Sequence, residues 1–125
     1  MDENTIISCS LDKTMKVWDI RTGYCSKTLT ENPGYDHALV KASKHIIVSG
    51  RSNSTIKIWD LRTGSCLNTY NGHTDTVFTL VKMGGNAIVS GSFDTTIKLW
   101  NISTGTCSKT LKGYKYPICS ILKID

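Results

Sequence analysis

Residues 88–111 read IVSGSFDTTIKLWNISTGTCSKTL, and similar stretches occur at residues 47–70 (IVSGRSNSTIKIWDLRTGSCLNTY) and 6–29 (IISCSLDKTMKVWDIRTGYCSKTL). The three stretches align without a gap, at intervals of 41 residues. The strictest recurring positions are Trp18, Trp59 and Trp100, Gly23, Gly64 and Gly105, and Cys25, Cys66 and Cys107. A fixed period between about 20 and 50 residues is typical of solenoids and propellers. The chain is therefore expected to consist of three equivalent structural units.

Each period contains four short segments that are rich in β-branched residues and are separated by Gly, Asn, Asp or Thr-Gly turns. This pattern predicts a four-stranded antiparallel meander and no helix of any length. Gly84 and Gly85 permit positive φ in one turn, and Asp94 can accept a hydrogen bond from its own backbone two residues on in another. In the third repeat the expected strands are residues 76–82, 87–91, 96–102 and 107–111.

These residues resemble the WD40-repeat family. The resemblance rests on the Gly72-His73 pair, the Ser-Gly-Ser-Phe-Asp run at residues 90–94 and the Trp59-Asp60 pair, all in the family's order, and it covers nearly the whole chain. It implies a β-propeller, in which four-stranded blades surround a central channel and form a rigid platform for peptides and proteins. The predicted fold class is thus all-β, with three antiparallel propeller blades in each chain.

The resemblance also implies a buried network in each blade, which joins a loop histidine, a strand serine or threonine, a turn aspartate and the tryptophan. Only the third repeat has every member, and no known motif spacing places a nucleophile beside its His-Asp pair, so we interpret the network as structural. The two other blades are expected to be less rigid. The matching residues are His73, Ser90 or Ser92, Asp94 and Trp100 in the third repeat; Asn32 and Asn53 replace the histidine and the aspartate in the middle one; and the first has Asp12 and Trp18, with Tyr114 at the equivalent later position of the histidine.

Three blades are too few for a ring, because propellers have about four to eight. The first repeat lacks a segment for its first strand, and residues 117–123 match a first strand without the rest of a blade. We therefore expect one unit over residues 1–125, with blades near 5–29 (completed by 117–123 of another copy), 36–70 and 76–111. Two copies would close head to tail as a homodimeric ring of six blades. The alternative is a fragment of a longer propeller.

The composition favours a binding protein inside the cell. The net charge of +5 invites a nucleic-acid hypothesis, but the basic residues are scattered along the chain, and Lys16, Lys57 and Lys98 recur at one repeat position. No apolar run is long enough to span a bilayer, and the N-terminal residues are acidic where a secretion signal would be basic. Five cysteines, of which three share a repeat position, indicate reduced thiols. The expected location is intracellular, in the cytoplasm, the nucleus or both.

No P-loop, dinucleotide motif, nucleophile elbow or metal-ligand spacing is present, so we expect no enzyme, no metal and no cofactor. The predicted function is a scaffold or adaptor that binds peptides or partner loops at the channel mouth; RNA binding and a purely structural half-propeller are the alternatives. Phe78 and Phe93 are the first candidates, as aromatic anchors, and Arg51 could pair with an acidic or phosphorylated group. The positions that the resemblance carries over to the mouth are His37, Phe78 and Cys119 on first strands, and Leu11, Ser52 and Phe93 in the turns.

Overall fold

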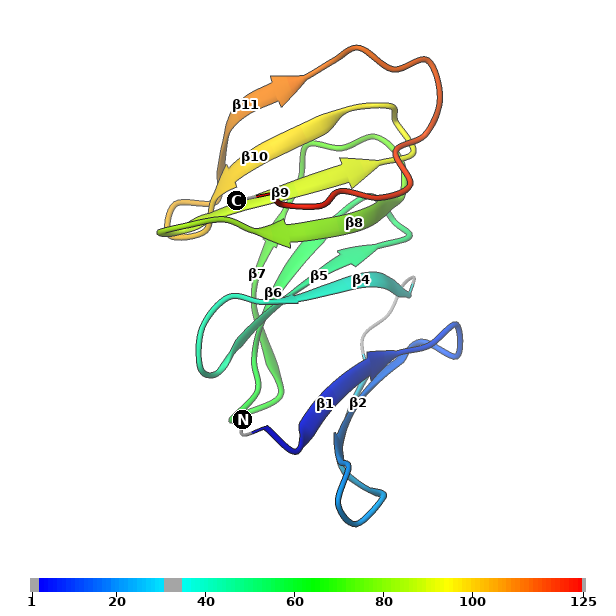
Figure 1. Cartoon of the computed structure of the whole chain (residues 1–125), viewed down its shortest axis with the longest axis vertical. Coiled ribbons are helices and arrows are strands. Elements are labelled where there is room, and N and C mark those ends of the chain that lie inside the picture. Colours follow the sequence, from blue (N-terminus) through cyan, green and yellow to red (C-terminus); the bar gives the residue numbers. More distant parts are fainter. Residues whose placement is uncertain (1–2, 31–34, 125) are drawn as a thin grey trace.

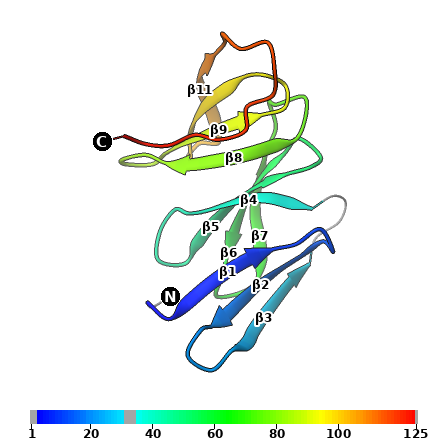
Figure 2. The same cartoon turned by 45° about the vertical axis from the view of Figure 1, so that its right-hand side comes forward.

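The computed structural model describes residues 3–30 and 35–124, which form three antiparallel sheets placed side by side along an arc (Figures 1 and 2). We call each sheet a blade and number the blades along the chain. The first blade has the strand order β1-β2-β3, the second β4-β5-β6-β7 and the third β11-β10-β9-β8. The strands are β1 (Thr5–Cys9), β2 (Thr14–Asp19), β3 (Tyr24–Thr30), β4 (Asp36–Lys41), β5 (Ile46–Arg51), β6 (Ile56–Asp60), β7 (Ser65–Tyr70), β8 (Val77–Lys82), β9 (Ala87–Ser92), β10 (Ile97–Asn101) and β11 (Thr106–Leu111).

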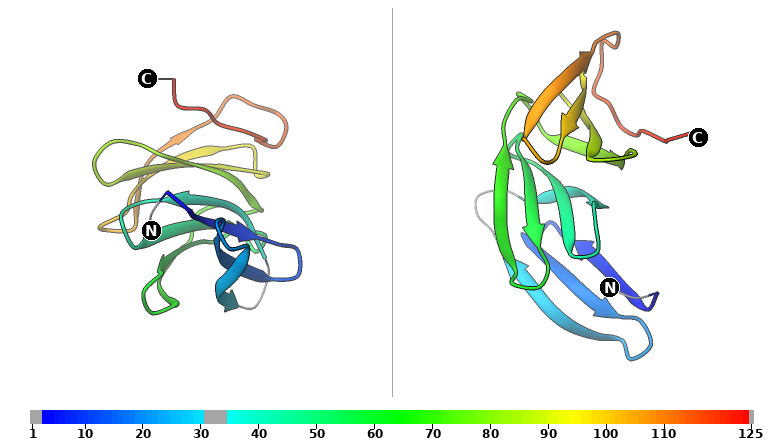
Figure 3. Two further views of the ribbon diagram at one scale, coloured as in Figure 1. Left: turned by 60° about the horizontal axis from the view of Figure 1, so that its bottom comes forward. Right: turned by 90° about the vertical axis from the view of Figure 1, so that its left-hand side faces the viewer.

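The prediction of an all-β chain with three antiparallel blades is confirmed, and the described part of the chain contains strands but no helix. No helix that could span a membrane occurs there. The innermost strands β4 and β8 lie on the concave side of the arc, and β3, β7 and β11 lie on its convex side (Figure 3). The first blade has three strands among the described residues, and β1 forms its inner edge.

Residues 117–123, predicted to be a first strand that completes a blade of another copy, form no strand in the single chain, and their pairing with a second copy stays a prediction. The segment is extended over the third blade, where the backbone N–H of Ile118 donates to the carbonyl of Ser92 at 3.0 Å, but it pairs with no strand. An isolated extended segment has no ladder partner on its outer side, so its backbone cannot complete the pattern that defines a strand. Ring closure by another copy is therefore a proposal and is argued below.

Two apolar clusters join the blades. The first and second blades share a cluster of Met15, Val17, Leu29, Ile47, Trp59 and Leu61, and the second and third blades share one of Val48, Ile56, Ile58, Tyr70, Val77, Leu80, Ile88 and Trp100. The alternation of the strands explains this arrangement, because side chains at every second position point to the same face of a sheet. In each joint the following blade thus contributes its tryptophan face, and the preceding blade contributes the opposite face, which we call the aliphatic face.

Three turns share an unusual backbone conformation. Lys13, Ser54 and Thr95 have φ angles of 72°, 73° and 77°, although none of them is glycine. The residue before each one bonds to the backbone N–H two positions later: Asp12 to Thr14 at 2.9 Å, Asn53 to Thr55 at 3.3 Å and Asp94 to Thr96 at 2.9 Å. These side-chain bonds fix the turn and offset the cost of a left-handed residue.

Candidate functional site

Four aromatic side chains form a continuous row across the second and third blades. The ring centroids of Tyr35 and His37 lie 5.6 Å apart, those of His37 and Phe78 5.4 Å, and those of Phe78 and Phe93 5.0 Å. Phe93 is exposed, and the other three rings are half-buried. We call these four residues the aromatic row. It presents adjoining ring faces and edges to solvent at one end of the two inner strands.

The backbone at the inner strands explains how two of these rings project. In the second blade Asp36 pairs with Arg51 and Ala38 pairs with Gly50, so His37 is an extra residue in β4. Phe78 is the equivalent extra residue in β8. A β-bulge of this kind leaves one residue outside the ladder and redirects its side chain. Both bulged residues therefore contribute to the aromatic row.

The structure places the remaining candidate residues differently. Ser52 supports the row, because its backbone N–H donates to the carbonyl of Tyr35 at 2.9 Å and its hydroxyl accepts from the N–H of Tyr35 at 3.0 Å. Leu11 is exposed on a turn of the first blade, and Cys119 is exposed in the segment over the third blade. Neither Leu11 nor Cys119 is a member of the aromatic row. Sequence reasoning missed Tyr35, which precedes the expected strand and has Thr76 as its counterpart in the third repeat.

The prediction for Arg51 is wrong. Its side chain is completely buried, and its guanidinium Nη1 donates to the Asp36 carboxylate at 2.8 Å. A buried charge of this kind requires a partner inside the protein, so the cation is not available to an acidic group of a ligand. The repeat alignment contained a sign of this pairing, because the two positions change together: the third repeat has Val77 and Ser92 where the second has Asp36 and Arg51.

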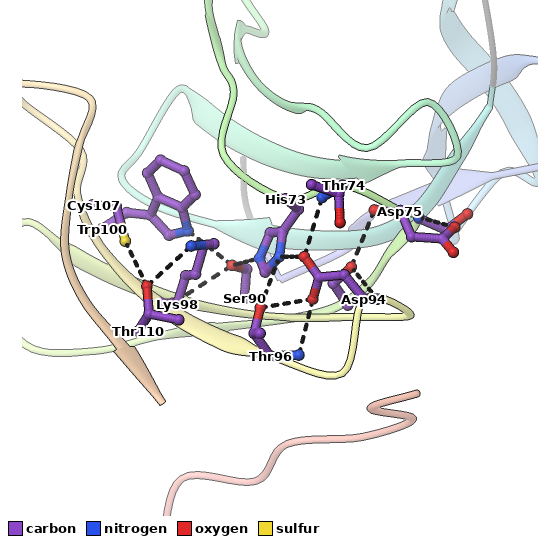
Figure 4. A network of polar contacts seen from close by, with 12 residues as sticks. His73, Thr74, Asp75, Ser90, Asp94, Thr96, Lys98, Trp100, Cys107 and Thr110 are labelled. Carbon is purple, nitrogen blue, oxygen red and sulfur yellow. Dashed lines mark hydrogen bonds and ion pairs between the residues drawn. The ribbon is translucent and has the colours of Figure 1, made fainter. Parts of the chain in front are cut away.

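A second set of polar residues lies inside the third blade (Figure 4). The indole N–H of Trp100 donates to the Ser90 hydroxyl at 2.8 Å, and that hydroxyl lies 2.6 Å from Nε2 of His73. Nδ1 of His73 lies 2.8 Å from the Asp94 carboxylate. Ser92 is outside this chain of contacts, because its hydroxyl accepts from the N–H of Asp94 and donates to the carbonyl of Asp75.

The protonation states of this network follow from its burial. Burial lowers the pKa of His73 by more than the neighbouring Asp94 carboxylate raises it, so the imidazole is neutral at pH 7. Burial alone would raise the pKa of Asp94, but hydrogen bonds from Thr96, His73 and backbone amides outweigh it and hold that pKa well below its usual range. We therefore assign the Nδ1 proton of a neutral His73 to the bond with the Asp94 carboxylate, and the Ser90 hydroxyl proton to the bond with Nε2.

Serine, histidine and aspartate stand here in the order of a catalytic triad, which the sequence motifs did not predict. Ser90, however, is completely buried, and its oxygen already accepts the indole N–H of Trp100. A substrate carbonyl cannot reach a hydroxyl that is enclosed between the strands and the indole. The geometry supports a structural network that ties the loop at His73 to the turn at Asp94.

The other two blades retain parts of this network. Trp18 donates to Ser8, and Trp59 donates to Ser49, each at 2.9 Å. Asn53 holds its turn through Thr55, and Asp12 does the same through Thr14, but no histidine joins either turn among the described residues. Asn32 lies outside the described residues, and Tyr114 is exposed. The reduced rigidity of these blades stays a prediction.

No group of three or more potential metal-binding side chains occurs within residues 3–30 and 35–124. The lysines at the recurring position bond to threonines of the outer strands, Lys16 to Thr28 at 3.0 Å and Lys98 to Thr110 at 3.0 Å. These cations thus lie on the blades' outer strand pairs and not in the aromatic row.

Comparisons with known proteins agree with the repeat structure. The family model described as "WD domain, G-beta repeat" matches residues 1–19, 24–60 and 64–101. A WD repeat-containing protein 89 homolog of Dictyostelium discoideum is 57% identical over 28 residues, which are 22% of this chain and 8% of that protein. The nuclear distribution protein PAC1 of Arthroderma otae is 54% identical over 26 residues, 21% of this chain and 6% of that protein. Each match therefore covers a small part of the relative.

Among solved structures, the crystal structure of the computationally designed Ika8 protein superposes with a TM-score of 0.83 and 36% sequence identity. The superposition covers 100% of this chain and 39% of that protein. The three blades described here thus have the same arrangement as a part of a longer chain.

Proposed function

The chain belongs to the WD40-repeat family, and from this membership and the aromatic row we propose that it is a non-enzymatic protein-interaction scaffold. Its ligands are peptides or partner loops that bind at the channel mouth, and its working form is a ring of six blades made from two copies. The expected location in the cytoplasm or nucleus stays a prediction.

The observation that carries this proposal is the aromatic row. Four adjoining rings beside one end of the inner strands β4 and β8, with Phe93 exposed, offer a preformed apolar surface with polar edges at Tyr35 and His37. Aromatic anchors of this kind dominate binding energies at protein interfaces, because they lose little conformational entropy and bury a large area. The row fits a peptide that presents an apolar or aromatic side chain.

The experiment uses a phage-displayed random peptide library selected against the purified chain. Peptides that bind the wild-type chain are compared with Phe93→Ser and Phe78→Ser variants, and Leu67→Ser serves as the matched control because Leu67 is an exposed apolar residue on the outer strand β7. We expect at least a tenfold loss of affinity for the Phe variants and no change for Leu67→Ser. Equal affinity for all four proteins would refute the placement of the site.

RNA binding is the second candidate, favoured by the net charge of +5. The same titrations distinguish it when a single-stranded RNA oligonucleotide is the probe. Phosphate contacts give a steep loss of affinity between about 50 and 200 mM salt, whereas a peptide held by aromatic rings shows a shallow dependence. Tight, strongly salt-dependent RNA binding that is indifferent to Phe93→Ser would favour the nucleic-acid function over the proposed one.

A further inference from the structure

The two joints inside the chain have the same chemistry. In each joint the aliphatic face of one blade covers the tryptophan face of the next, with Leu29 against the second blade's Trp59 cluster and Tyr70 against the third blade's Trp100. Lys27 adds a polar contact to the first joint, because its Nζ donates to the carbonyls of Leu61 at 2.6 Å and Arg62 at 3.2 Å.

The two outward faces at the ends of the arc are the two halves of such a joint. On the tryptophan face of the first blade, Ile6 is 50% exposed, while its counterparts Ile47 and Ile88 are 3% and 0% exposed. On the aliphatic face of the third blade, Leu111 is 51% exposed, while its counterpart Tyr70 is 5% exposed. Each open face therefore has the side chains that a joint requires and lacks only the opposite half.

A groove of about 190 Å³ lies beside β1, between the first and second blades. β1 pairs with β2 along one edge, and no strand of the described chain pairs with its inner edge. An unpaired strand edge is a template for an added strand, and apolar groove walls select the side chains of that strand. The groove is lined by Thr5, Ile7, Leu39, Val40, Lys41 and Ile47.

Ile118 and Ile121 lie against the third blade at the position that an innermost strand of a further blade would take. A Cβ added to Gly91 would lie 2.6 Å from Ile118, just as one added to Gly50 would lie 2.7 Å from Val77 of the true inner strand β8. The side chains of residues 117–124 that face away from the third blade are not covered, and Leu122 is 83% exposed. Figure 1 shows this segment crossing the third blade next to β8 and β9.

We propose that the groove beside β1 is a strand-acceptor site, and that its occupant is residues 118–123 of a second copy. The repeat interval sets the register: Ile118 lies opposite Ser10, Ser120 opposite Cys9 and Leu122 opposite Ile7, as Asp36, Ala38 and Val40 lie opposite Arg51, Gly50 and Val48 in the second blade. Leu122 then enters the groove, because Val40 at the equivalent position packs into a joint cluster.

The same superposition of repeats predicts a polar contact across the new joint. Lys109 is the counterpart of Lys27, and the carbonyls of Ile20 and Arg21 are the counterparts of those of Leu61 and Arg62. Lys109 is exposed in the single chain. In the joint its ammonium donates to these two carbonyls of the neighbouring copy.

A second copy fits better than another occupant because both halves of the joint are present on one chain. Two identical joints, related by a two-fold axis, close three blades and three blades into a ring without a remaining edge. The donor segment needs no rearrangement, since Ile118 already contacts the third blade in the required place. This inference rests on the ring proposed above as the working form and identifies the residues that close it.

Sedimentation velocity of the full chain over a wide concentration range tests the inference, with Leu122→Asp and Lys109→Met as variants. Leu67→Asp is the matched control, because Leu67 is also an exposed leucine but lies on β7, away from the joint. We expect the wild type and Leu67→Asp to sediment as dimers. We expect Leu122→Asp to weaken dimerisation at least tenfold, since it removes the apolar contact of Leu122 and places a carboxylate against Ile7, Leu39 and Ile47, and Lys109→Met to weaken it less.

The outcomes separate the inference from the proposed function. A wild-type dimer that Leu122→Asp and Lys109→Met leave intact overturns this joint but not the ring. A wild type that sediments as a single chain at every concentration overturns both the joint and the two-copy ring, while the peptide-selection experiment still decides whether the aromatic row binds ligands. Circular dichroism checks that each variant is folded, and Lys109→Met decides the matter if Leu122→Asp is not.

Discussion

Replacing the buried pair Asp36–Arg51 by the residues of the third blade is expected to lower the free energy of unfolding less than the two single replacements together do. The pair joins β4 to β5 directly, since the two residues are register partners, and the same positions in the third blade hold Val77 and Ser92. The third blade therefore shows that a neutral valine–serine pair fits at these two positions. The variants are Asp36→Val, Arg51→Ser and the double substitution.

The magnitude follows from burial and distance. The side chains of Arg51 and Asp36 are 0% and 6% exposed, and their charged atoms are 2.8 Å apart. Removing one member of a buried ion pair costs about 3–5 kcal/mol, because the remaining charge loses the 2.8 Å contact while it stays out of water, whereas replacing both by neutral groups is often nearly neutral. A loss of that size is a large part of the total stability of a small domain, and it lowers Tm on the order of 10–20 °C.

Urea unfolding followed by tryptophan fluorescence measures these free energies, because Trp59 in the same blade is buried. Each single variant should lose about 3–5 kcal/mol, and the double variant should recover at least about 2 kcal/mol relative to the sum of the two losses. Double-variant stability equal to that sum would refute the argument, since it would mean that the charges act independently.

Two further predictions concern titration and thiol chemistry. His73→Asn should lower the unfolding free energy at pH 7 by about 1–3 kcal/mol, because the variant loses buried hydrogen bonds. It should also reduce the loss of stability below about pH 6.5, because in the wild type the unfolded chain protonates His73 there while the folded chain, with its lowered His73 pKa, does not. His45 stays in both proteins, so identical pH profiles of urea unfolding would contradict this role. Cys9 should react with iodoacetamide more slowly than the exposed Cys25, since burial and the nearby charge of Asp36 raise the Cys9 pKa, and peptide mass spectrometry over time would show equal labelling rates if this were incorrect.

The sequence predicted the architecture well because the same signals occur three times. The expected third-blade segments at 76–82, 87–91, 96–102 and 107–111 correspond to β8, β9, β10 and β11 with shifts of about one residue at the ends. A single repeat would have left helix and strand ambiguous for such short segments. Three aligned copies reveal which positions vary freely, and the turns between them become visible.

The sequence predicted side-chain depth less well. Arg51 was expected to pair with an acidic or phosphorylated group of a ligand, but it is buried and pairs with Asp36 on the neighbouring strand. Residues 117–123 have the composition of a strand, but a strand also requires a neighbour. Tyr35 joined the aromatic row through tertiary packing that no local pattern indicates. In each case the missing information is a contact between segments distant in the chain.

The bulges at His37 and Phe78 have a consequence for how the proposed binding surface can change. Each of these residues is an extra residue outside the hydrogen-bonded ladder. A substitution there changes the exposed side chain without changing which backbone groups pair. The strand alternation that fills the core continues on either side. In the proposed scaffold, binding and folding are thereby specified at separate positions of the same strand, and single substitutions at the bulges would change the ligand preference while the core sequence stays the same.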